Sequence, residues 1–134
     1  MALEPDFRLD GPHDPALTQA AADQIAERVK FLVYATLGGA PGLGDPADAD
    51  RLISALYTAT GRMPQLFDQV TRFANRLAAT GRLRDDENRS ANGQVARASY
   101  HLDEARGHAA KLTGALQAAQ NVFSALSVTE DGDD

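Results

Sequence analysis

Small and apolar residues recur at alternating steps of four and three along the C-terminal third of the chain. The repeat consists of Ala91, Val95, Ala98, Leu102, Ala105, Ala109, Leu112, Leu116, Ala119, Phe123 and Leu126. A period of 3.5 residues is typical of a helix that packs lengthwise along another helix, as in a coiled coil. The pattern therefore predicts one long helix over 86–126, about 60 Å in length at the rise of an α-helix.

Three shorter helices are predicted upstream, over 14–37, 45–61 and 64–81. The first two open on the same signal, Asp14-Pro15 and Asp45-Pro46, because aspartate caps a helix N-terminus and proline is tolerated at the first helical position. The second and third end on a shared phrase, Ala-Thr-Gly-Arg followed by an apolar residue, at 59–63 and 79–83. Glycine followed two residues later by an apolar side chain is a typical C-cap.

These elements predict an all-α protein, an antiparallel four-helix bundle in which the long C-terminal helix is the spine. A single helical domain is expected over 14–126. The segment 1–13 has two prolines and few apolar residues, so we expect a flexible N-terminal arm there. The segment 127–134 carries four acidic residues, and we expect a disordered acidic tail.

The amino-acid composition excludes several kinds of catalytic, metal-binding and membrane-spanning site. The 134-residue chain has a net charge of −6 and no cysteine, which excludes disulfides, thiolate catalysis and cysteine-based metal sites. Its longest apolar run, 31–35, is far too short to cross a bilayer, so a cytoplasmic protein is expected. No motif indicates a cofactor or a small-molecule substrate, and the chain is expected to be non-catalytic.

Three glycines fall on the flank of the long helix opposite its apolar repeat: Gly93, Gly107 and Gly114. An exposed helical glycine costs about 1 kcal/mol relative to alanine, so this flank is expected to be covered. Ala110 and Ala118 lie near the same flank. Together these five residues predict an interface with a second copy, forming a homodimer, or with another protein.

Nucleic-acid binding is an alternative function. The two helices expected around Gly61 have the lengths of a helix-turn-helix, a motif whose second helix reads the DNA major groove. The residues that would contact DNA are Gln69, Arg72, Arg76, Arg82 and Arg84. The acidic charge of the whole chain counts against this interpretation, because affinity for nucleic acid depends on neutralised phosphates.

A metal-dependent enzyme is a second alternative. His101, Glu104 and His108 fall within about 60° of arc on the long helix, a spacing that could present three ligands to one side. The order differs from the His-Glu-x-x-His of zinc peptidases and reverses the Glu-x-x-His of di-iron bundles. Histidines that flank a helical seam are more often solvated or hydrogen-bonded.

The segment from Arg62 to Gln69, together with Leu83-Arg84-Asp85-Asp86 and a terminal alanine-rich helix, resembles uncharacterised small helical proteins of actinobacterial plasmids and integrated mobile elements. The resemblance covers about half of the chain and includes no catalytic motif. It implies an accessory role in a mobile element. The expected function is thus a helical protein-interaction module that self-associates through its long C-terminal helix.

Overall fold

The computed structural model describes residues 6–129, which contain three α-helices and no strand. These are α1 (Pro15–Ala35), α2 (Pro46–Ala79) and α3 (Ala91–Phe123). The all-α class is confirmed, whereas the prediction of four helices is not. Residues 1–5 of the expected arm and 130–134 of the expected tail lie outside the described residues.

The helices predicted over 45–61 and 64–81 form one continuous helix of 34 residues, α2. Gly61 and Pro64 both lie inside it, at the position where a turn was expected. Proline inside a helix removes one backbone hydrogen bond and clashes with the preceding turn, at a cost of about 3 kcal/mol. α3 packs along α2 on both sides of this point, so contacts between the two helices offset that cost.

The N-caps predicted at Asp14 and Asp45 are confirmed. Asp14 Oδ1 accepts from the backbone N–H of Leu17 at 2.8 Å. Asp45 forms a reciprocal capping box, in which Asp45 Oδ1 accepts from the N–H of Asp48 (3.0 Å) and Asp48 Oδ2 accepts from the N–H of Asp45 (3.3 Å). Both caps satisfy backbone donors that a helix N-terminus leaves free.

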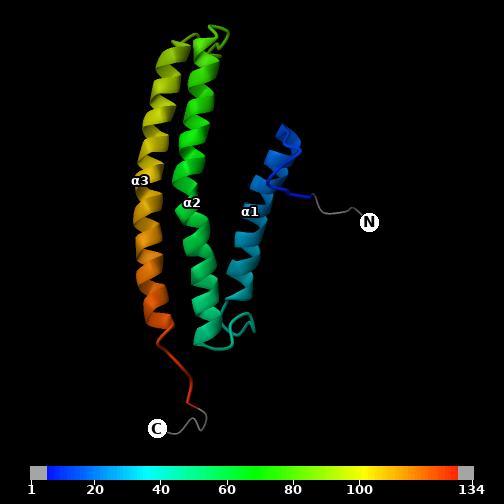
Figure 1. The fold of residues 1–134 in the computed structure, drawn as a ribbon, viewed down its shortest axis with the longest axis vertical. Coiled ribbons are helices and arrows are strands. Elements are labelled where there is room, and N and C mark those ends of the chain that lie inside the picture. The colour runs from blue at the N-terminus through cyan, green and yellow to red at the C-terminus, as the bar shows by residue number, and fades with distance from the viewer. Residues whose placement is uncertain (1–5, 130–134) are drawn as a thin grey trace. The chain divides into compact units, whose positions relative to one another are not determined.

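The chain divides into two compact units, 1–44 and 45–134. The first contains α1 and the glycine-rich turn that follows it. In that turn a Cβ on Gly42 would overlap the backbone carbonyl of Ala35, so only glycine fits there. The second unit is an antiparallel hairpin of α2 and α3, which lie side by side along their whole length (Figure 1).

The long helix is shorter than predicted, because α3 begins at Ala91 and ends at Phe123. The residues before it, 80–90, form the connection from α2. Ser90 is the N-cap, its Oγ accepting from the N–H of Gly93 at 3.1 Å. The acidic residues around Asp85 thus lie in the connection between the helices and do not form the first turn of α3.

A hydrogen bond between side chains fixes the register of the hairpin. Thr113 Oγ1 of α3 donates to Thr60 Oγ1 of α2 at 2.8 Å. Thr60 is 6% exposed, which makes it the most buried polar residue described. The core on either side of this bond is thin: among the described apolar residues only Val95 and Ala109 are buried, and no side chain is fully buried.

A candidate helix-docking surface on the hairpin

The two sides of the α2–α3 hairpin differ in polarity, and the register shows which residues belong to each. Taking Thr60 and Ala109 as facing the opposite helix, positions related by whole heptads share that direction. Because the helices are antiparallel, residues that are turned about the helix axis in the same direction from the facing position, one on each helix, lie on the same side of the hairpin. Gly61 and Thr113 illustrate this, since a Cβ on Gly61 would lie 3.7 Å from Thr113 Cγ2.

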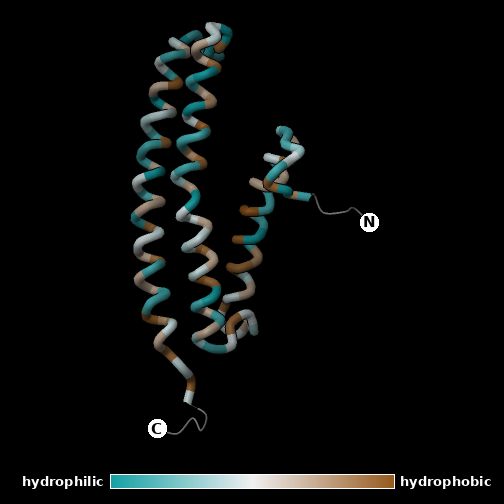
Figure 2. Tube along the Cα trace, viewed as in Figure 1, coloured by the Kyte–Doolittle hydropathy of each residue, from teal (hydrophilic) through white to brown (hydrophobic). Residues whose placement is uncertain are grey.

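One side, which we call the apolar side, carries a stripe of large aliphatic and aromatic residues on α2. Its exposed members are Leu66, Val70, Phe73 and Leu77, with exposed fractions of 49%, 44%, 53% and 38%. The stripe continues toward the start of α2 through the half-buried Leu52, Leu56 and Met63. Brown and teal positions alternate along this part of the trace (Figure 2). These residues repeat at steps of four and three, the pattern that fits a further helix.

On α3 the apolar side is formed by smaller residues. Ala98 and Leu112, both predicted to lie in the seam with the neighbouring helix, are exposed there, Leu112 by 50%. Thr113 takes the position against α2 that the repeat predicted for Leu112. Near the connection a shallow groove of about 190 Å³ lies between the helices. Its lining residues are Ala74, Leu83, Arg84, Asp85, Ala91, Gln94, Val95 and Ala98.

The opposite side of the hairpin, the polar side, carries ion pairs. Arg72 Nε lies 2.9 Å from Asp68 Oδ2 on α2, and Arg106 Nη1 lies 3.3 Å from Asp103 Oδ1 on α3. Asp50 and Ser99 also lie on this side, where Asp50 Oδ1 and Ser99 Oγ are buried and have no hydrogen-bond partner among the described residues. The exposed large apolar residues of α2 are therefore gathered on one side only.

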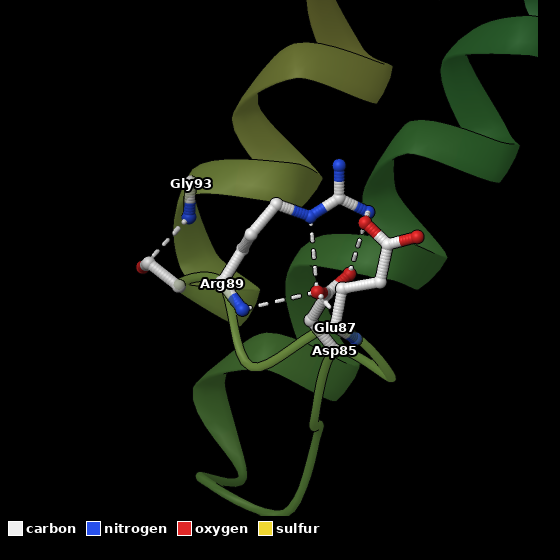
Figure 3. A network of polar contacts seen from close by, with 5 residues as sticks. Asp85, Glu87, Arg89 and Gly93 are labelled. Atoms are coloured by element: carbon white, nitrogen blue, oxygen red, sulfur yellow. Dashed lines mark hydrogen bonds and ion pairs between the residues drawn. The ribbon is translucent and has the colours of Figure 1, made fainter.

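The connection between the helices is organised by one carboxylate. Asp85 Oδ2 accepts from Arg89 Nε and from the backbone N–H groups of Glu87 and Arg89, each at 3.0 Å (Figure 3). Asp85 Oδ1 accepts from Arg89 Nη2 at 3.2 Å. The side-chain hydrogen bond from Arg89, aided by these backbone donors, lowers the pKa of Asp85, and the same bond raises the pKa of Arg89. This network holds the connection at the end of the groove.

The residues of the predicted glycine interface are all exposed: Gly93, Gly107, Gly114, Ala110 and Ala118. A Cβ placed on Gly107 or Gly114 would meet no atom within 4 Å. A Cβ on Gly93 would contact only Ser90, its own N-cap. This glycine face lies away from α2 and is separate from the apolar side.

The candidate DNA-binding residues do not form the predicted motif. Because α2 is continuous through Gly61, there is no turn and no separate recognition helix. Gln69, Arg72 and Arg76 are exposed on α2, and Arg82 and Arg84 lie in the connection. Arg72 is already paired with Asp68.

The candidate metal ligands are brought together only in part. His101 Nδ1 lies 2.9 Å from Glu104 Oε1, one turn along an exposed part of α3. His108 is exposed and takes no part in this His101–Glu104 pair. Within residues 6–129 no group of three histidine or acidic side chains has a geometry that could hold a metal ion.

Comparisons with known proteins add no family to this description. Neither the protein-family models, nor the curated proteins, nor the solved structures gave a match to this chain. In the part of the chain that the structure describes, no helix has the length and apolar character needed to cross a membrane.

Proposed function

We propose that the protein is a non-catalytic interaction module that binds a helix on the apolar side of its α2–α3 hairpin. The observation that carries this proposal is the exposure of Leu66, Val70, Phe73 and Leu77 as one continuous stripe. The stripe spans about 17 Å at the helical rise, and with its half-buried extension to Leu52 about 38 Å. Exposed apolar patches of this extent typically mark interaction sites.

The thin core of the hairpin supports the same conclusion. Two helices alone bury little apolar surface, and here only Val95 and Ala109 are buried among the apolar residues described. A third helix seated between α2 and α3 would cover the stripe and the groove near Ala98. At about 25 cal/mol per Å² of apolar area, covering such a stripe would supply several kcal/mol of binding free energy before association costs.

The test compares two variants with matched positions on α2. Leu66→Gln with Phe73→Ser removes the centre of the stripe, and Gln65→Ser with Asn75→Ser changes exposed polar positions of the same helix. Proteins that the native chain retains and the first variant does not are purified and titrated by calorimetry. We expect the stripe variant to weaken binding of such a pair by at least about tenfold, or about 1.4 kcal/mol, and the control to leave it unchanged.

Circular dichroism of the same variants provides an independent check. The stripe variant should keep the helical signal and the unfolding midpoint of the native protein, because the stripe is not part of the core of the hairpin. A large loss of either would show that these side chains stabilise the fold of the chain itself, and the proposal would fail.

Self-association through the glycine face is a second candidate. The specific observation is the open space around Gly107 and Gly114, which lets another helix approach the backbone closely. Sedimentation equilibrium of the native chain and of Gly107→Leu with Gly114→Leu tests it. A dimer that dissociates at least about tenfold more readily in the variant would support this candidate, and a strict monomer at high micromolar concentration would exclude it.

A further inference from the structure

Basic residues line both edges of the apolar side. Arg62 and Arg76 lie on α2, and Arg97 and Lys111 lie on α3. On each helix these residues follow next to the apolar positions around the helix axis, on the flank farther from the neighbouring helix. All four are exposed, and within residues 6–129 no ion pair joins any of them to a carboxylate. Arg84 adds a fifth cation, since it lines the groove near Ala98.

The register places these cations in two pairs. Counting two residues onward from Thr60 and two back from Thr113 reaches Arg62 and Lys111, so these two lie at one level of the hairpin. Counting sixteen residues in the same way reaches Arg76 and Arg97. The Arg62–Lys111 pair and the Arg76–Arg97 pair are fourteen residues apart on each helix, or about 21 Å along the hairpin. This separation equals two heptads of a further helix lying along the groove.

The carboxylates on the apolar side are fewer than its five cations. Glu104, one heptad from both Arg97 and Lys111, has Oε1 2.9 Å from His101 Nδ1, and Asp85 is held by Arg89 at the end of the groove. Asp48 is engaged in the capping box at the far end of the hairpin. The apolar side is therefore locally basic in a chain whose net charge is −6.

Resting on the proposed function, we infer that the occupant of the apolar side is an amphipathic helix with acidic residues on both flanks of its apolar stripe. Its acidic groups should recur fourteen residues apart, to meet the Arg62–Lys111 and Arg76–Arg97 levels together. Rim charges of this kind select partners by complementarity and steer their approach.

A second copy of the chain fits this side poorly. If two apolar sides pressed together about a two-fold axis, the basic edges of one hairpin would face the basic edges of the other. Like charges placed opposite one another across an interface disfavour that pairing. An extended nucleic-acid backbone is a poor fit as well, because a stripe of leucine, valine and phenylalanine separates the two lines of cations.

The test uses the full chain and three designed 28-residue helical peptides that share one leucine stripe. The first carries glutamate on both flanks at positions fourteen residues apart, the second carries lysine at those positions, and the third carries glutamine. Fluorescence anisotropy at about 50 mM and about 300 mM salt should show the acidic peptide binding at least about tenfold more tightly than the lysine peptide at low salt. The difference should shrink at the higher salt.

Matched neutralised variants locate the effect. Arg76→Gln with Arg97→Gln should reduce the preference for the acidic peptide several-fold. Arg72→Gln with Arg106→Gln, which removes two arginines from the polar side, should keep it. Equal reductions in both variants would show a general charge effect and would overturn the inference.

The remaining outcomes separate this inference from the proposed function. Equal binding of all three peptides, lost on Leu66→Gln with Phe73→Ser, would overturn the acidic preference and leave the helix-docking function standing. No binding of any peptide, or tighter binding of duplex DNA or anionic phosphatidylserine vesicles, would overturn the inference. So would tighter binding of a peptide with the sequence of residues 15–35, or a chain that dimerises on this side.

Discussion

Thr113 Oγ1 donates a hydrogen bond to Thr60 Oγ1 at 2.8 Å, and these two hydroxyls join residues 53 positions apart in the sequence. Thr60 Oγ1 in turn donates to the backbone carbonyl of Tyr57 at 3.3 Å, so each hydroxyl has a partner. The pair lies near the middle of α2 and in the second half of α3, one turn from the buried Ala109. It therefore sets which turn of α2 faces which turn of α3.

We expect Thr60→Val and Thr113→Val each to lower the free energy of unfolding by about 1 kcal/mol. Each single variant removes the bond between the helices, while the remaining hydroxyl keeps a backbone acceptor, the Ala109 carbonyl for Thr113 and the Tyr57 carbonyl for Thr60. The double variant should cost less than the two single changes together, because both single variants already lose the same bond. Urea unfolding followed by circular dichroism measures all three, and strictly additive losses would contradict a direct bond.

Gly61 and Gly81 lie in the same Ala-Thr-Gly-Arg sequence, but Gly61 is inside α2 and Gly81 follows its end. They therefore give a matched pair of substitutions. Gly61 lies inside α2, and a Cβ there would make only an ordinary contact with Thr113, so Gly61→Ala should stabilise the protein by about 1 kcal/mol. Gly81 has φ +71°, so Gly81→Ala should destabilise it by about 1–2 kcal/mol. Thermal unfolding should separate the two variants in opposite directions, and two losses of equal size would indicate that Gly61 ends a helix in solution.

Asp85 should make the stability of the hairpin depend on pH. Its pKa is lowered in the folded protein, chiefly by the side-chain hydrogen bond from Arg89. A lowered pKa means that the stabilisation is fully present above the ordinary aspartate value of about 3.9 and is lost as the pH falls through the folded value. Urea midpoints between about pH 5 and pH 2.5 should fall less steeply for Asp85→Asn than for the native chain.

Asp86→Asn is the control for that experiment, because Asp86 is exposed and forms no ion pair with any residue that the structure describes. It should reproduce the native pH profile. A native profile in both variants would show that the Asp85 network contributes nothing measurable to folding.

Ala109 and Ala110 test the packing between the helices at neighbouring positions. Ala109 is 7% exposed against α2, whereas Ala110 is exposed on the outer surface. Ala109→Leu should overpack the seam and cost about 1–3 kcal/mol. Ala110→Leu should change the unfolding free energy by less than about 0.5 kcal/mol. Similar effects at both positions would contradict the packing described.

The sequence predicted much of this fold because caps and periodicity are local signals. Asp14 and Asp45 cap their helices as expected, and the 3.5-residue repeat located α3 to within a few residues. The break at Gly61 was wrong because the same five-residue phrase can end a helix or continue it, and only the neighbouring helix decides which. At Gly61 α3 runs alongside, whereas at Gly81 no further apolar turn of α2 follows.

The candidate site was less predictable for a related reason. Leu66, Phe73 and Leu77 recur at helical spacing in the sequence, but the side of the hairpin on which they lie follows only from the register that Thr60 and Thr113 provide. The same limit applies to the two levels of cations, whose members are far apart in sequence.

The start of α2 and the end of α3 lie at the same end of the hairpin, with the Asp85 connection at the other (Figure 1). The two helices are thus joined by the chain at one end of the hairpin only, and their other ends are held together by side-chain packing. Fluorophores at exposed Ala47 and Asn121, near the open end, would report any change in the distance between the two helices when a partner docks on the apolar side.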